Sequence, residues 1–166
     1  TLSSSSAASD VYKRQRYSCC LLHHEIKGKF ELIFKKGEDK IYPLGDKYFM
    51  AVAGETCDRD WFASYIQRNV DFYTYKNGYK LDLEAIAQFT RRTLADALRE
   101  GPFQTNVLIG GIDEDGEAKL YWLDYLGTLE RVTKGAHGYA GYFVSSVLDN
   151  AYKKAITKEE GLKAIK

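Results

Sequence analysis

The chain has 166 residues, of which 45% are hydrophobic and 28% are charged, and this ordinary globular composition excludes a wholly disordered protein. Its formal net charge is +1, so no excess of positive charge directs it to nucleic acid or to an anionic membrane. The three cysteines do not suit a disulfide framework, which indicates a reducing compartment, and no apolar run approaches the roughly 20 residues of a membrane span.

The N-terminal segment differs in composition from the rest of the chain. Residues 1–18 are rich in Ser, then basic, and have neither a helical nor a strand period. Such a segment buries too little apolar surface to offset the entropy of ordering it. We therefore interpret residues 1–25 as a disordered or artefactual segment and residues 26–166 as the folded domain.

Three short extended segments open the regular part, at residues 31–34, 40–44 and 48–53. Pro43 in the second segment predicts an edge strand or a strand end, because proline has no N–H to donate to a ladder. The third is a continuous apolar run closed by Gly54, which is typical of a strand covered on both faces.

A first helix is predicted over residues 56–75. Either Thr56 or Asp58 is a candidate N-cap, and Asn77-Gly78 supplies a left-handed stop. Apolar and aromatic residues recur at helical spacing and predict the buried stripe: Trp61, Phe62, Tyr65, Ile66, Val70 and Tyr73.

A second helix is predicted over residues 82–100, with Asp82 as its N-cap and Gly101-Pro102 after its end. Its apolar stripe is Ile86, Phe89, Thr90, Leu94, Ala97 and Leu98.

Strands return in the second half of the chain and are followed by helices. A hairpin turn over residues 113–116 places glycine where a positive φ is wanted. Thr157 and Glu160 form a capping box for a last helix. The remaining predicted elements are strands at 106–112, 117–125 and 128–133, a glycine-punctuated loop at 135–141 and a helix at 142–153. Because strands and helices are grouped rather than alternating, the fold class is α+β, with helices layered on antiparallel sheets.

Several residue groups carry chemistry that must be weighed against structural roles. A free N-terminal Thr1 is a candidate nucleophile, but it leads a segment without a strand pattern. The run from Cys19-Cys20 to His23-His24 has metal-capable atoms in adjacent positions, which do not match zinc-ligand spacing. His137 is a candidate base for which the sequence places no nucleophile nearby, and a loop or interface role is favoured.

The remaining candidates are also better explained as structural features. The loop at residues 135–141 lacks both a dinucleotide-binding and a P-loop pattern. The acidic turn Asp113-Glu114-Asp115 lacks the spaced ligands of a calcium loop, and Arg91-Arg92 is interpreted as an exposed or partner-facing pair. The sequence therefore predicts no catalytic, metal-binding or cofactor-binding residues and no cofactor.

Residues 38–166 resemble the beta subunits of the eukaryotic 20S proteasome, and within them the non-catalytic type-2 subunits. The segments that carry the resemblance are Asp39-Lys40-Ile41, Met50-Ala51-Val52-Ala53-Gly54-Glu55, Tyr65-Ile66-Gln67-Arg68-Asn69-Val70, Tyr75-Lys76-Asn77-Gly78-Tyr79, Phe89-Thr90-Arg91-Arg92, Leu94-Ala95, Ala97-Leu98-Arg99, Tyr121-Trp122-Leu123-Asp124-Tyr125-Leu126-Gly127-Thr128-Leu129 and Gly135-Ala136-His137-Gly138-Tyr139.

The resemblance implies the four-layer αββα sandwich of N-terminal nucleophile hydrolases, here incomplete at both ends. It implies a structural subunit that completes a seven-membered beta ring for ubiquitin-dependent protein degradation. The implied partners are the other beta subunits, the opposite beta ring and the adjacent alpha ring, and the implied location is cytoplasm and nucleus. Missing terminal strands would leave the strands at 48–53 and 107–112 short of neighbours and the isolated chain unstable.

The resemblance also bears on catalysis. Active subunits combine a processed N-terminal Thr with a downstream Asp and Lys, and Lys40 matches the lysine position. The threonine-led strand and the Asp have no counterpart, and active subunits place a Ser where this chain has His137. The resemblance therefore implies a subunit that is not itself an enzyme. The alternatives are an active threonine peptidase that uses Thr1, and a stand-alone binding domain.

Overall fold

The computed structural model describes residues 25–27, 33–36, 39–138, 141–151 and 160. Most of the described chain forms one five-stranded antiparallel sheet in the order β3-β4-β5-β6-β7, and a separate two-stranded sheet pairs β1 with β2. The strands are β1 (Glu25–Lys27), β2 (Ile33–Lys36), β3 (Ile41–Leu44), β4 (Tyr48–Gly54), β5 (Thr105–Ile112), β6 (Ala118–Leu123) and β7 (Leu129–Val132). The helices are α2 (Thr56–Asn77), α3 (Leu83–Ala97) and α4 (Gly141–Ala151).

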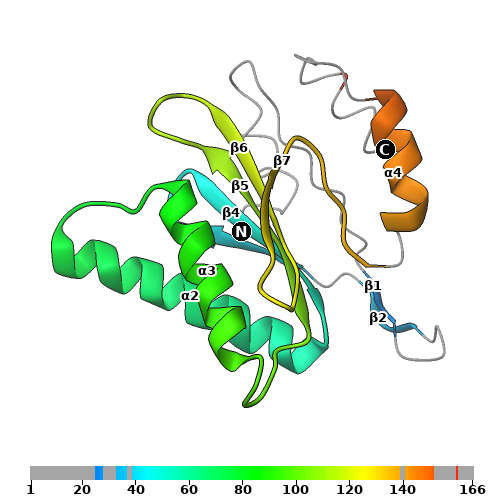
Figure 1. Ribbon diagram of the computed structural model, residues 1–166, viewed down its shortest axis with the longest axis horizontal. Coiled ribbons are helices and arrows are strands. Elements are labelled where there is room, and N and C mark those ends of the chain that lie inside the picture. Colours follow the sequence, from blue (N-terminus) through cyan, green and yellow to red (C-terminus); the bar gives the residue numbers. More distant parts are fainter. Residues whose placement is uncertain (1–24, 28–32, 37–38, 139–140, 152–159, 161–166) are drawn as a thin grey trace.

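The helices divide between the two sides of the five-stranded sheet. Helices α2 and α3 lie against one face, where α2 contacts β3, β4 and β5, and α3 contacts β5, β6 and β7. Helix α4 and the small β1–β2 sheet lie beyond the opposite face (Figure 1). We call the two sides the helix face and the loop face of the sheet.

The central strands β4 and β5 are fully paired. Strand β4 pairs with β3 on one side and β5 on the other, and β5 pairs in turn with β6. The expectation that these two strands are short of neighbours was therefore wrong: the edges of the sheet are β3 and β7. The sequence pattern could not reveal the pairing of β4 with β5, because residues 55–104 separate the two strands. Pro43 lies in edge strand β3, as predicted.

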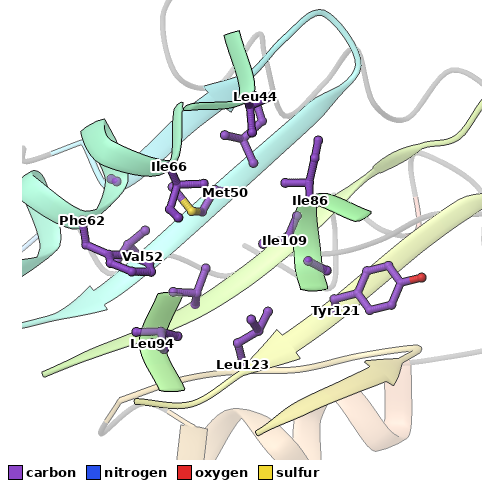
Figure 2. Close-up of a cluster of buried hydrophobic side chains, with 14 of the residues drawn as sticks. Leu44, Met50, Val52, Phe62, Ile66, Ile86, Leu94, Ile109, Tyr121 and Leu123 are labelled. Atoms are coloured by element: carbon purple, nitrogen blue, oxygen red, sulfur yellow. The ribbon is translucent and has the colours of Figure 1, made fainter. Parts of the chain in front are cut away.

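The hydrophobic core fills the space between the helix face and helices α2 and α3. Successive residues of a strand point to opposite faces, so Met50 and Val52 enter this core while Ala51 does not. Figure 2 shows side chains from both helices meeting those of the sheet. The labelled residues are Leu44, Met50, Val52, Phe62, Ile66, Ile86, Leu94, Ile109, Tyr121 and Leu123.

Helix α2 begins and packs differently from the prediction. Glu55 is its N-cap and makes no side-chain capping bond, so neither Thr56 nor Asp58 serves as the cap. The Asp58 carboxylate accepts a hydrogen bond from the backbone N–H of Gln104 at 3.0 Å, which ties the helix to the segment before β5. The predicted stop is confirmed, since Gly78 follows the helix with φ +75° and its N–H donates to Thr74 O.

The buried stripe of α2 is narrower than predicted. Phe62, Ile66 and Val70 repeat at intervals of four residues and are buried. Trp61 and Tyr65 precede two of them by one position, so they are turned toward solvent and are 57% and 38% exposed. There they stack on each other with ring centroids 5.3 Å apart.

Helix α3 and the β5–β6 hairpin match the sequence analysis closely. The Asp82 side chain caps α3 by accepting a bond from Ala85 N–H at 2.7 Å. Gly116 adopts φ +75° in the turn between β5 and β6. Helix α4 begins one residue earlier than predicted and its described part ends at Ala151. The proposed cap at Thr157 and the expected disorder of residues 1–18 lie outside the described residues.

The α+β class is confirmed, with helices packed on an antiparallel sheet. None of the helices within the described part of the chain is long and apolar enough to cross a bilayer.

Candidate functional site

The candidate site lies on the loop face, where residues 134–138 cross the sheet between β7 and α4. Ala51, Leu108 and Leu120 form a small buried cluster on this face, with Trp122 and Val132 packed against it. Gly135 lies so close that an added Cβ would be 3.1 Å from Leu108 Cδ2. A larger residue at this position would therefore have to displace side chains of the sheet, Leu108 and Trp122 first.

His137 fastens this loop to the sheet. Its ring stacks on Trp122 with centroids 4.7 Å apart and an interplanar angle of 23°. Its Nε2 lies 3.1 Å from Val107 O, and because a carbonyl only accepts, Nε2 is the donor. Burial lowers the pKa of His137, partly opposed by backbone carbonyls and by the charge of Asp124. The imidazole is therefore neutral at pH 7.

A cavity of about 510 Å³ lies between the loop and helix α4. Its polar side chains come from Lys134, His137, Ser145 and Asp149, and Leu148 forms an apolar part of the wall. Lys134 Nζ pairs with Asp149 Oδ1, which joins the loop to α4. Ser145 Oγ donates to Gly141 O within the first turns of the helix.

The cavity brings a serine, a histidine and a carboxylate together but does not connect them as a catalytic relay. A relay needs the base bonded to the nucleophile and the carboxylate bonded to the base. Ser145 instead bonds to the backbone of its own helix, His137 bonds to Val107 O, and Asp149 pairs with Lys134. Each group is thus bonded outside the set.

Lys40 matches the lysine position of active subunits. Its backbone lies level with that of Val107, the residue bonded to His137, on the other side of strand β4. Val52 N–H donates to Lys40 O at 3.0 Å, and Val52 pairs with Val107 across β4 and β5. Since neighbouring strands are about 4.8 Å apart, the backbones of Lys40 and Val107 are separated by roughly 10 Å. The Lys40 side chain is partly buried.

The other sequence candidates are not brought into this site. Thr1 and the Cys19-Cys20 to His23-His24 run lie outside the described residues. Arg91 and Arg92 are exposed on α3, where Arg92 lies 3.7 Å from Asp96. Within the described ranges, no group of three or more His, Cys, Asp or Glu side chains could hold a metal ion.

The acidic turn after β5 contains a nearly buried ion pair. Asp113 Oδ2 and Lys119 Nζ are 2.5 Å apart, with the two side chains 8% and 13% exposed. Tyr48 Oη also donates to Asp113, at 3.3 Å. The bond from Lys119 lowers the pKa of Asp113, and burial raises the pKa of Tyr48 to about 12. Asp113 therefore fixes the hairpin end rather than presenting an open cation site.

Sequence reasoning identified His137 but not Lys134, Ser145 or Asp149, the polar residues that share its cavity. The four-residue spacing of Ser145 and Asp149 places both on one side of a helix, and this was the available signal. The pairing of Lys119 with Asp113 was also missed, although both flank a predicted hairpin turn.

Comparison with known proteins identifies similar sequences along most of the chain. The profile of the family described as "Proteasome subunit" matches residues 24–166. Proteasome subunit beta type-2-A of Arabidopsis thaliana is 42% identical over 134 residues, which cover 81% of this chain and 66% of the relative.

Two further relatives extend the similarity beyond that plant. Proteasome subunit beta type-2 of Oryza sativa subsp. japonica is 40% identical over 79% of this chain and 62% of the relative. Proteasome subunit beta type-4 of Saccharomyces cerevisiae is 41% identical over 81% of this chain and 69% of the relative. The chain thus spans about two thirds of the length of the relatives it matches.

Proposed function

The chain belongs to the proteasome subunit family, and from this membership we propose that it is a non-catalytic type-2 beta subunit of the 20S core. Its role is to complete the beta ring for ubiquitin-dependent protein degradation, while neighbouring subunits hydrolyse the peptides. The observation that carries the proposal is the 40–42% identity to beta type-2 subunits over about four fifths of the chain.

The site geometry supports the non-catalytic part of the proposal. The loop position that holds a Ser in active subunits is His137 here, and its Nε2 is held by Val107 O. The lysine of the family is retained as Lys40, but a lysine side chain does not supply the hydroxyl nucleophile of a threonine peptidase. A threonine peptidase needs a base and oxyanion donors arranged around one hydroxyl. The hydroxyl of Ser145, in the same cavity as His137, instead donates its hydrogen bond to Gly141 O.

The proposal includes the finer features that the family implies. The first is a four-layer αββα sandwich. The five-stranded sheet would be one of its two sheets, with α2 and α3 as one outer layer, and the second sheet would cover the loop face. The proposed partners are the neighbouring beta subunits, the opposite beta ring and the adjacent alpha ring. The proposed location is cytoplasm and nucleus.

A chimera with a related subunit tests assembly. In the type-4 beta subunit of yeast, which is 41% identical to this chain, the matching segment is replaced by residues 39–151 of this chain. The tagged chimera is expressed in yeast whose own type-4 subunit is repressed. We expect the chimera to co-purify with the other proteasome subunits. A control chimera with Gly135→Trp, whose large side chain would collide with Leu108 and Trp122, should be recovered in smaller amounts. A soluble chimera that never joins other subunits contradicts the proposal.

Substitution in the assembled particle tests the absence of catalysis. Particles that contain Lys40→Ala in the chimera are expected to keep the peptide-hydrolysing activity of the unsubstituted chimera, per assembled particle.

For the alternative that uses Thr1, the peptide-hydrolysing activity of the purified 166-residue chain is compared with that of Thr1→Ala. Cleavage by the chain alone that disappears in Thr1→Ala would establish the peptidase alternative and overturn the proposal.

A further inference from the structure

Two tyrosines at the end of helix α2 contact each other through their hydroxyl groups. Tyr73 Oη and Tyr79 Oη are 2.7 Å apart, and their rings meet edge to face with centroids 5.6 Å apart and an interplanar angle of 87°. The bond between the phenols raises the pKa of Tyr73.

The end of the helix creates this contact. Helix α2 ends at Asn77, and Gly78 adopts the left-handed conformation with φ +75°, which turns the chain back along the last turns of the helix. Residue 79 consequently lies beside residue 73. Both side chains can be reached from solvent: Tyr79 is 60% exposed, and Tyr73 forms part of the wall of an open cavity of about 430 Å³ between α2 and α3.

We propose that Tyr73 and Tyr79 are an oxidative modification site at which a peroxide-derived one-electron oxidant joins the two rings as dityrosine. Each phenol loses one electron and its hydroxyl proton and becomes a phenoxyl radical with spin density on the ring carbons beside the oxygen. The two radicals form one Cε–Cε bond, and each coupled ring carbon then passes its hydrogen to the phenol oxygen. One hydrogen peroxide, reduced to two waters, takes up the two electrons and two protons.

The hydrogen bond favours this pair over three other tyrosines of the described residues, Tyr42, Tyr48 and Tyr65. It holds the two phenols in contact before oxidation, with the oxygens 2.7 Å apart, so coupling requires the two rings to shift against each other but not to find each other by diffusion. The hydroxyls of Tyr42 and Tyr48 instead donate to the carboxylates of Asp60 and Asp113, which cannot couple. Tyr65 stacks on Trp61 rather than on a second phenol.

Tyr75 is the informative comparison, because it is more exposed than either member of the pair, at 89%. It follows Tyr73 by two residues on the same helix, and residues with this spacing point in different directions. If exposure alone decided the product, Tyr75 would be the main reactant. If contact decides it, Tyr73 and Tyr79 are joined.

Tryptic mapping of the full 166-residue chain tests the site. The dilute chain is treated with a peroxidase and hydrogen peroxide, and the monomer is digested. Cleavage after Arg68, Lys76 and Lys80 leaves Tyr73 and Tyr79 in separate peptides, residues 69–76 and 77–80. We expect these peptides to be recovered as one joined species, lighter than their sum by two hydrogen atoms, with dityrosine fluorescence.

Three single substitutions identify the reacting residues. Tyr73→Phe and Tyr79→Phe keep the rings and remove the hydroxyls, and each is expected to abolish the joined species. Tyr75→Phe changes the other tyrosine of the same tryptic peptide and is expected to leave it unchanged. Persistence in Tyr73→Phe, loss in Tyr75→Phe, or a wild-type product found only between separate chains overturns the proposal.

Treatment in urea separates folded geometry from closeness in sequence. The unfolded wild-type chain should give a smaller share of the 73–79 product relative to other dityrosines, because the helix end that aligns the pair is lost. An unchanged share would mean that six residues of separation suffice without the contact, and it would contradict the proposal.

Discussion

The two faces of the five-stranded sheet are built in contrasting ways. The helix face carries large aliphatic side chains, including Met50, Val52 and Ile109, which pack against two helices and are fully buried. On the loop face, the buried cluster consists of Ala51, Leu108 and Leu120. Residues one position apart on the same strand, such as Ala51 and Val52, thus belong to different environments.

The contrast separates stability from candidate chemistry. Burial of large side chains supplies most of the free energy of folding, so the helix face anchors the domain. The loop face is joined to its covering segment by a stacked histidine, one hydrogen bond to the backbone and an ion pair. Such a cover can be altered without unfolding the sheet. The following predictions measure how far the two faces are energetically independent.

The largest effect is expected on the helix face. Ile66→Ala removes buried methyl groups from the centre of the core and should lower the free energy of unfolding by about 2–5 kcal/mol, measured by urea denaturation. Tyr75→Ala on the same helix, where the side chain is 89% exposed, should change it by less than about 0.5 kcal/mol. Equal losses for the two variants would mean that the core is not where this structure places it.

The ion pair at the end of the β5–β6 hairpin comes next. Asp113→Asn removes a charge that accepts bonds from Lys119 and Tyr48, and it should cost about 2 kcal/mol at pH 7. Because the folded-state pKa of Asp113 is lowered, its contribution is present above the unfolded pKa of about 3.9 and is lost as pH falls from there through the folded pKa.

Stability curves at several pH values check this prediction. The wild type should lose more stability on acidification than Asp113→Asn does. Asp115→Asn, an exposed carboxylate of the same turn, is the matched control and should follow the wild type. If the acid dependence of Asp113→Asn matched that of the wild type, the pair would not contribute as described.

On the loop face, His137→Gln should cost about 1 kcal/mol, since one hydrogen bond and one ring stack are lost. The folded-state pKa of His137 is lowered, so the folded state binds fewer protons than the unfolded state. Its contribution is complete above the unfolded pKa of about 6.5 and is lost as pH falls from there toward the folded pKa. The free energy of unfolding from urea titrations should differ between pH 7.5 and pH 5.5, and this difference should shrink in His137→Gln. An undiminished difference in His137→Gln would contradict the prediction.

The smallest effect concerns the attachment of α4. Lys134→Met breaks the partly exposed pair with Asp149 and should change global stability by about 0.2–1 kcal/mol. The amides of α4 should nevertheless exchange faster with deuterium, while those of β5 keep their protection. Faster exchange in β5 as well would show that the two faces unfold together, and the comparison drawn above would fail.

Local signals in the sequence predicted much of the fold. Asp82 as a cap, Gly78 as a helix stop and Gly116 in the hairpin turn act within a few residues, so a short window contains the necessary information. The bond from Gln104 N–H to Asp58, one of the two candidate caps, depends on residues far apart in the chain and could not be predicted from a short window. Likewise, the sequence identified His137 as a candidate by its residue type alone. It could not predict the bond to Val107 O or the stacking on Trp122, because those residues are distant in the chain.

The long connection between β4 and β5 joins two parts of the sheet that are each local in the chain. The β3–β4 hairpin and the β5–β6–β7 meander each pair strands that are close in the chain. The hairpin and the meander join through seven residue pairs between β4 and β5. Residues 55–104, which include α2 and α3, connect these two strands. Closing so long a loop loses conformational entropy before any contact between β4 and β5 forms, and this slows their pairing. We therefore expect β4 to keep one unpaired edge until the helices and β5 have been synthesised. We expect that unpaired edge to be open to pairing with another nascent chain during translation.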